Sequence, residues 1–343
     1  MKKALISFFF TCFCCIFLIF LLFYSKECIA LASNGLLIWY RNMIPSLFPF
    51  MVLSGFIIRC GLSAKIGQWL QPFLGLFFRL PPPMLYVIFM GFLCGFPMGA
   101  KMVADMLEKE QITEKEGEYL LSFCNNIGPL YMLGYVIPLF DYENTLKILG
   151  LMYLIPFMYG LILRYAGDSH DKKCLTPLSL SACFYPQNNR IPVNYLVCFQ
   201  QSLSSAIEQI TILGGCMVFF NCLLIFPQIL NTFLLQTHVT SYSSLFSAVF
   251  SSLIEIGGGL HQLALSSHPT NMNTEVQSLT SIVITASHNS LHIFLPLALL
   301  TFGGLSCIAQ TCFILKNTGL KISTYIKHKF IQACIFIILI FIF

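Results

Sequence analysis

Charged residues are scarce in this sequence. Only 10% of its 343 residues are Asp, Glu, Lys or Arg, whereas a soluble domain carries about 25%. Hydrophobic residues make up 57%, and the mean hydropathy is +0.79. The apolar residues come in runs of about 20, the length at which a helix crosses a hydrocarbon core roughly 30 Å thick. The composition excludes a soluble protein and predicts an all-α polytopic membrane protein.

Signatures of several function classes are also missing. The net charge of +5 is small, and no basic cluster is interleaved with aromatic residues, so nucleic-acid binding is not expected. No Walker motif, nucleophile elbow or Rossmann fingerprint occurs, which leaves an ATP-driven pump or a familiar hydrolase without support. We therefore expect neither an enzyme nor a bound cofactor.

Cysteine is plentiful, with 15 residues, but no metal site or disulfide framework follows from it. The cysteines are scattered through apolar segments, where free Cys behaves as a small hydrophobe, and the CxxC of Cys12 and Cys15 lies inside a predicted span. His288 and His292 are spaced i and i+4 and could share a metal. With no third ligand nearby, an amphipathic helix face explains them equally well.

The first half of the chain predicts both spans and interruptions. Residues 1–30 hold an apolar run longer than the core of a signal peptide, which predicts a retained first span with a cytoplasmic N-terminus. Gly35–Ile58 forms a second span that Pro45 and Pro49 should kink or break. An amphipathic stretch follows over Arg59–Leu80, and consecutive prolines at 81–83 stop any helix there.

Met84–Met98 is apolar but too short to cross comfortably, and it ends in glycines and a proline that favour a turn. We predict a re-entrant hairpin here. Lys101–Glu118 is expected to form a solvated helix or a hairpin arm, with Thr113 and Glu116 in capping-box spacing. The remaining predicted spans are 120–139, 146–164, 207–229, 245–265, 279–315 with interruptions, and 330–343.

The distribution of basic residues supports this layout. If Met84–Met98 enters and leaves on one side, the basic residues of the first half and of the polar linker all face the cytoplasm, as the positive-inside rule requires. The acidic turn at Asp141 then lies outside. These basic residues are Arg59, Lys65, Arg79, Lys101, Lys109, Lys115, Arg164, Lys172 and Lys173.

The chain also shows weak internal similarity. An offset of about 160 brings VLSG at 52–55 over ILGG at 212–215, and a larger offset brings LLSF at 120–123 over LLTF at 299–302. We predict a first repeat over 31–165, a polar linker over 166–200, and a second repeat with a C-terminal span over 201–343. With the linker inside, the two repeats would be inverted copies containing broken helices, an architecture of many secondary transporters.

Helix breaks at membrane depth survive only inside protein or beside a water-filled cavity, so the breaks are the candidate site. Two asparagines near the first break, Asn125 and Asn126, either bind a polar ligand or join neighbouring helices. Glu255 lies within an apolar run, a position typical of proton exchange or ion coordination. The candidate substrate-binding residues are Gly95, Pro97, Gly99, Ser122, Asn125, Asn126, Gly128, Glu255, Gly303, Gly304 and Gln310.

Two segments carry a family resemblance. With GFPMGAK at 95–101 and LLSFCNNIGPLYMLG at 120–134, the chain resembles the YlbJ family of sporulation integral membrane proteins, which belong with the Gate or nucleoside-recognition membrane proteins. The resemblance implies a transporter-like fold and a role in spore formation. Gly257 departs from the polar residue that family members often carry there, which weakens residue-level transfer at that point.

We therefore predict a sporulation-associated permease of the cell membrane that moves a small polar solute, for example a nucleoside-like one, through a midplane site. The candidate partners are the lipid bilayer, the solute and a second copy of the chain. The alternative is a non-transporting scaffold for spore cortex assembly. Its docking surfaces would be Lys101–Glu118 and Gly167–Val197.

Overall fold

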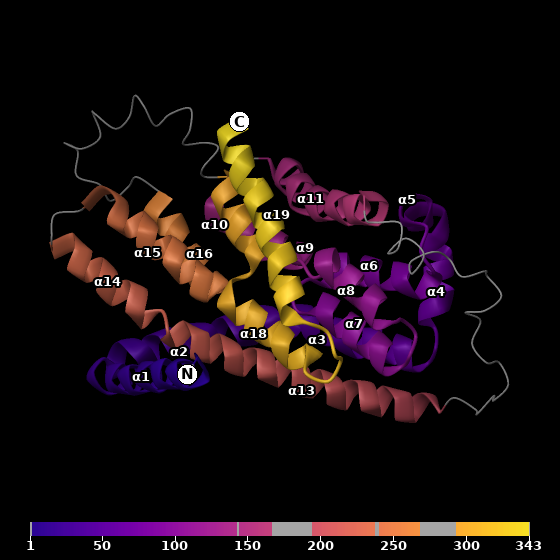
Figure 1. Cartoon of the computed structure of the whole chain (residues 1–343), viewed down its shortest axis with the longest axis horizontal. Coiled ribbons are helices and arrows are strands. Elements are labelled where there is room, and N and C mark those ends of the chain that lie inside the picture. The colour runs from indigo at the N-terminus through magenta and orange to yellow at the C-terminus, as the bar shows by residue number, and fades with distance from the viewer. Residues whose placement is uncertain (1, 143, 167–193, 237–239, 268–292, 343) are drawn as a thin grey trace.

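The computed structural model describes residues 2–142, 144–166, 194–236, 240–267 and 293–342 (Figure 1). All regular structure in these ranges is helical. Six helices are long and apolar enough to cross a membrane, or seven if one bent pair counts as a span. This confirms the prediction of an all-α polytopic membrane protein.

The N-terminal helix α1 (Lys2–Phe23) is followed, after Tyr24, by α2 (Ser25–Ile38), η1 (Trp39–Met43) and α3 (Ile44–Arg59). α2 to α3 form one span of 35 residues. The sequence predicted that Pro45 and Pro49 would kink or break this segment. The helix is not broken there. The π-helical turn η1 ends shortly before Pro45, and π-helical turns are among the features at which helices bend.

This long helix packs against α13 (Tyr195–Cys222). The Trp39 indole donates to the Ile210 carbonyl at 2.8 Å, and near the other end of the contact the Cys198 thiol donates to the Arg59 carbonyl at 3.8 Å. Along this contact the residue numbers of α13 decrease as those of α2 and α3 increase, so the two helices run antiparallel.

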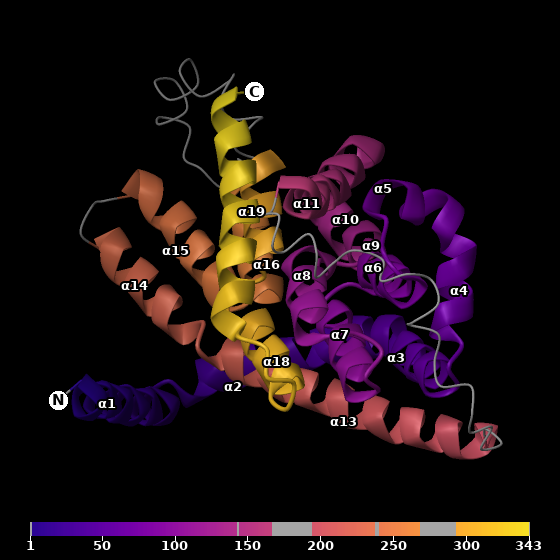
Figure 2. The same cartoon turned by 45° about the vertical axis from the view of Figure 1, so that its right-hand side comes forward.

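A bent helix and a hairpin come next in the chain. α4 (Ser63–Leu70), η2 (Gln71–Gly75) and α5 (Leu76–Phe78) lie at 86° to α6 (Pro82–Cys94), which confirms the predicted stop at the three prolines. α6 then folds back into α7 (Met98–Glu108), with the turn at residues 95–97 (Figure 2).

The helix α7 is buried, so the expectation of a solvated helix from Lys101 is wrong, and the hairpin-arm alternative is right. Lys101 is 3% exposed and Asp105 6%. α7 packs between α6, α8 and α18, and its two buried charged residues, Lys101 and Asp105, pair with each other. A buried pair tolerates the apolar surroundings that would exclude a single charge.

The predicted span at 120–139 is broken rather than continuous. α8 (Glu114–Cys124) begins with the predicted capping box, in which Thr113 N donates to Glu116 Oε2 at 2.8 Å and Glu116 N donates to Thr113 Oγ1 at 3.4 Å. After residues 125–128 the chain resumes as α9 (Pro129–Tyr131), η3 (Met132–Val136) and α10 (Ile137–Phe140). Pro129 excludes helical conformation at Gly128, which is extended (ψ 149°).

The rest of the described chain is also helical. α11 (Thr145–Ala166) ends the first half, and α14 (Ile225–Gln236) follows α13. The predicted span at 245–265 is instead a hairpin of α15 (Thr240–Ile254) and α16 (Ile256–Ser267), because the chain turns at Glu255. A helix at 293–302 and α18 (Gly304–Leu315) form a second interrupted helix.

The last helix, α19 (Ile322–Ile342), begins eight residues before the predicted span at 330–343. Buried side chains form two large apolar clusters, one around α3, α6, α7 and α13 and the other around α10, α11, α16, α18 and α19. The first hairpin and the first break contribute to both clusters, since Cys94 and Cys124 belong to one cluster and Phe96 and Ile127 to the other.

Candidate functional site

The first hairpin and the first helix break pack backbone against backbone. A Cβ on Gly95, whose φ is +86°, would lie 2.2 Å from Gly128 N, and one on Gly99 would lie 2.5 Å from the Cys124 carbonyl oxygen. Pro97 is the N-cap residue of α7. The structure therefore gives Gly95, Gly99 and Gly128 a role in the close approach of two irregular segments.

The second hairpin and the second break pack in the same way. A Cβ on Gly259 would lie 2.2 Å from Ser252 N, and one on Gly304 would lie 2.9 Å from the Ser252 carbonyl oxygen. Gly303, at φ +82°, approaches the first hairpin, since its Cβ would lie 3.3 Å from the Phe96 ring. The two pairs of irregular segments thus meet in the interior.

A cavity of about 50 Å³ lies where they meet. Its lining comes from both halves and includes Phe96, Gly128, Tyr131, Glu255, Gly257 and Gln310. One water needs roughly 10–15 Å³ on this measure, so the cavity holds a few waters or a small ion, whereas drug-sized ligands occupy clefts of several hundred Å³. In this conformation the site is too small for a nucleoside.

Glu255 supplies a buried carboxyl group to this cavity. It is 2% exposed, and its two oxygens accept hydrogen bonds from Gly257 N at 3.1 Å and Gly258 N at 2.6 Å. No basic side chain in the described ranges lies within 4.0 Å of it. The amides at the start of α16 stabilise the carboxylate, so the glycine at 257, where the family resemblance was weakest, contributes through its backbone.

Gln310 and Tyr131 are among the polar side chains that accompany Glu255 in the cavity wall. Gln310 donates from Nε2 to Ser306 Oγ at 3.1 Å, and both residues are buried in α18. The Tyr131 hydroxyl is buried without a hydrogen-bond partner among the described groups. Sequence reasoning did not single out Tyr131, because a tyrosine in an apolar run carries no pattern that marks it.

The two asparagines do not line the cavity. Asn125 accepts from Ala100 N at 3.3 Å and donates to Tyr325 Oη at 3.0 Å and to Thr311 Oγ1 at 3.3 Å. Asn126 donates to the Phe123 carbonyl at 2.5 Å and accepts from Lys329 Nζ at 2.7 Å. Both side chains join helices in this conformation, which was the alternative to ligand binding.

The residues that meet these asparagines come from α19 and were missed by the sequence analysis. Tyr325, Lys329 and Gln332 are spaced i, i+4 and i+7, so they lie on one helix face, and each is at most 1% exposed. Gln332 Nε2 donates to the Ser122 carbonyl at 2.7 Å, and Ser122 Oγ donates to Tyr119 O at 2.6 Å. The spacing was a usable signal, but the predicted span began at Phe330 and excluded two of the three.

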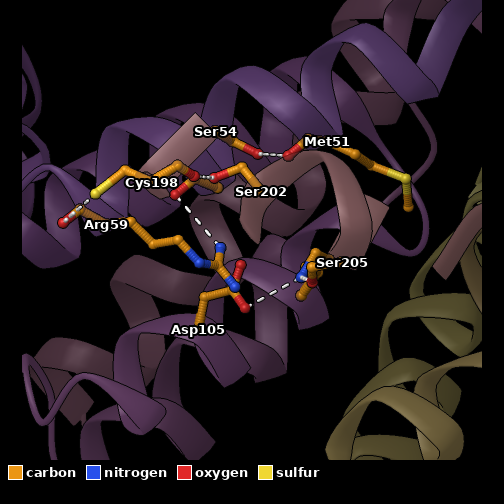
Figure 3. A network of polar contacts seen from close by, with 9 residues as sticks. Met51, Ser54, Arg59, Asp105, Cys198, Ser202 and Ser205 are labelled. Atoms are coloured by element: carbon orange, nitrogen blue, oxygen red, sulfur yellow. Dashed lines mark hydrogen bonds and ion pairs between the residues drawn. The ribbon is translucent and has the colours of Figure 1, made fainter. Parts of the chain in front are cut away.

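A second polar cluster fastens the first hairpin to the long helices (Figure 3). Lys101 Nζ lies 3.1 Å from Asp105 Oδ1 and 3.1 Å from Ser205 Oγ of α13. On the facing helices, Arg59 lies near Cys198 and Ser202 (Figure 3). Lys101, which begins the segment expected to be a solvated helix or a hairpin arm, is part of this buried attachment.

No group of three or more potential metal ligands occurs in the described part of the chain. His288 and His292 lie outside the described residues, as does the polar linker at 167–193. The cysteines of the described ranges, including Cys12 and Cys15, are free.

Comparisons with known proteins agree with this architecture. A family model described as Gate, nucleoside recognition, matches residues 40–140, which span α3, the first hairpin and the first helix break. The sporulation integral membrane protein YlbJ of Bacillus subtilis is 26% identical over 328 residues, covering 90% of this chain and 76% of the relative. No solved structure matches.

Proposed function

We propose that this chain, which is similar to YlbJ and matches the Gate family model, is a permease that moves a small polar solute across the membrane of a spore-forming cell. The observation that carries the proposal is the cavity between the two helix breaks, which both halves of the chain line. Broken helices that meet at an interior polar site are the usual substrate site of secondary transporters.

An internal repeat supports this proposal. The ends of α6 and α15, which are the first arms of the two hairpins, are Cys94 and Ile254, 160 positions apart. The helices that precede the two breaks end at Cys124 and Phe302, 178 positions apart. The offsets found in the sequence therefore align equivalent elements of the two halves.

The directions of equivalent helices support an inverted relation between the repeats. The first long helices, α2 to α3 and α13, run antiparallel. A Cβ on Gly319, just after the end of α18, would lie 2.8 Å from Glu114, the first residue of α8. The broken helix of the first half thus starts beside the end of its counterpart, so the two hairpins would enter the membrane from opposite sides.

The small cavity implies that the solute site opens by movement of a hairpin. Glu255 and Gly257 lie at the tip of the second hairpin, and Phe96 lies at the tip of the first. A shift of either tip would enlarge the cavity towards one side of the membrane. Glu255 would then meet the solute or a coupled cation, since a buried carboxylate without a basic partner favours a positively charged or hydrogen-bond-donating ligand.

Cysteine labelling tests the pathway. In a background without native cysteines, Phe96→Cys and Ile256→Cys place one thiol at each hairpin tip. We expect a membrane-impermeant maleimide to label the two thiols from opposite sides, because each hairpin opens to its own side. Protection of both thiols from both sides would contradict the proposal and favour the scaffold.

Part of the docking surface predicted for a scaffold is not accessible. α7 is buried from Met98 to Met106 apart from the half-buried Ala104. The exposed charges of that region are at the end of α7 and the start of α8. We expect the triple variant Glu108→Ala, Lys109→Ala, Lys115→Ala to form heat-resistant spores at the wild-type frequency, because a permease does not need these side chains. A loss of spores at normal protein level would instead indicate a docking function.

A further inference from the structure

The Lys329 side chain has no carboxylate partner in the interior of the described structure. Its side chain is 0% exposed, and no acidic side chain in the described ranges lies within 4.0 Å of Nζ. Its contacts are Asn126 Oδ1 at 2.7 Å and the face of the Phe96 ring, with 5.1 Å between Nζ and the ring centroid. An ammonium carries three donors, so one oxygen and one ring are sparse compensation for a buried charge.

The position of Lys329 explains why a cation is stable there. Asn126 follows the C-terminal end of α8, where the unpaired carbonyl groups of a helix carry partial negative charge. The neighbouring Gln332 donates to one of these carbonyls, that of Ser122. Its second amide atom, Oε1, is buried without a partner among the described groups.

We propose that Lys329 is a resident cation of the first helix break, occupying the place where a broken membrane helix otherwise binds a free monovalent cation. Carbonyl ends and unwound backbone of broken helices coordinate Na⁺ or protons in many transporters. Here the protonated side chain of Lys329, on α19, supplies that charge. The inference is independent of whether a solute crosses the membrane, because it concerns occupancy of the break in the resting protein.

It follows that the two helix breaks should respond differently to cations in solution. The first break needs no exchangeable cation, since Lys329 holds it closed by linking α19 to Asn126 and Phe96. An exchangeable cation or proton would act only at the second hairpin, where Glu255 lacks a basic partner. The wild-type first break should therefore be indifferent to monovalent salts.

The test uses the Lys329→Ala variant of the full chain and chemical rescue. Cys124, the last residue of α8, is 0% exposed and serves as the single reporter thiol. We expect Lys329→Ala to raise its maleimide labelling rate roughly tenfold or more, since a hydrogen bond to a charged group is lost. Methylammonium chloride should restore protection by binding in the vacated space, whereas the bulkier tetramethylammonium should not. Neither salt should change labelling of the protein with Lys329.

Two further variants keep the proposal falsifiable if Lys329→Ala does not fold. Lys329→Met retains length without charge, and Lys329→Arg retains charge. Accumulation and Cys124 protection in Lys329→Arg but not in Lys329→Met would support a requirement for the cation. Wild-type accumulation and protection in Lys329→Met, with no response to methylammonium, would overturn the proposal and leave Lys329 as a packing residue.

Discussion

Replacing Gly95 with alanine is expected to prevent the chain from folding stably in the membrane. The added Cβ would lie 2.2 Å from the backbone nitrogen of Gly128, and a φ of +86° is strained for any residue with a Cβ. The strain alone costs about 1–2 kcal/mol, and the clash with main chain cannot be relieved by a side-chain rotation. Because proteins are stable by only about 5–15 kcal/mol, the combined cost is severe.

The matched control for this substitution is Gly215→Ala. Gly215 lies inside α13, and a Cβ there meets no atom within 4 Å. Alanine in a helix interior is more favourable than glycine by roughly 0.5–1 kcal/mol, so this variant should be as stable as wild type or slightly more. Yield of monodisperse protein in detergent and its unfolding temperature measure both effects. A Gly95→Ala protein that matches Gly215→Ala would show that the contact between the first hairpin and the first break is looser than the structure indicates.

Replacing Glu255 with glutamine is expected to abolish the function while leaving the protein in the membrane. Glutamine keeps the length and one acceptor, but it turns an NH₂ group towards one of the two backbone amides that the carboxylate now accepts. Losing a charged hydrogen bond in a buried site lowers ligand affinity by roughly tenfold to a hundredfold. The frequency of heat-resistant spores, normalised to the amount of protein in the membrane, measures the loss.

Glu208→Gln is the control for the chemical change itself. Glu208 is an exposed residue of α13, so this variant should sporulate normally. The double variant Asn125→Ala, Asn126→Ala addresses the other sequence-predicted position, where the structure indicates a helix-joining role and hence reduced protein level. Normal sporulation of both Glu255→Gln and the double variant at wild-type protein levels would exclude this assignment of the site.

Local chemistry explains what could be predicted from the sequence. The turn of the first hairpin was predicted at Gly95 and Pro97 because these residues favour turns in any context. The capping box at Thr113 and Glu116 is likewise a pattern of neighbouring residues, and the structure shows its reciprocal hydrogen bonds. The class of the protein followed from composition alone, since its apolar surface needs lipid as a solvent.

Other elements were mispredicted because apolar composition hides helix breaks. The segments 120–139 and 245–265 are apolar enough to be whole spans, and only their packing shows that each is interrupted. At Gly128 the signal was present as a glycine before Pro129, but a Gly-Pro pair within an apolar run is also compatible with a kinked span.

The sequence by itself determined that this chain is a helical membrane protein with a hairpin at Gly95–Pro97, because hydropathy and backbone propensity act over a few residues. The tertiary structure decided which polar groups meet. It places Glu255 in a cavity that both halves line, and it brings Asn125 and Asn126 into hydrogen bonds with side chains of α19. Those pairings join residues up to 203 positions apart, and hydrogen bonding of buried groups depends on distance in space, which no local pattern encodes.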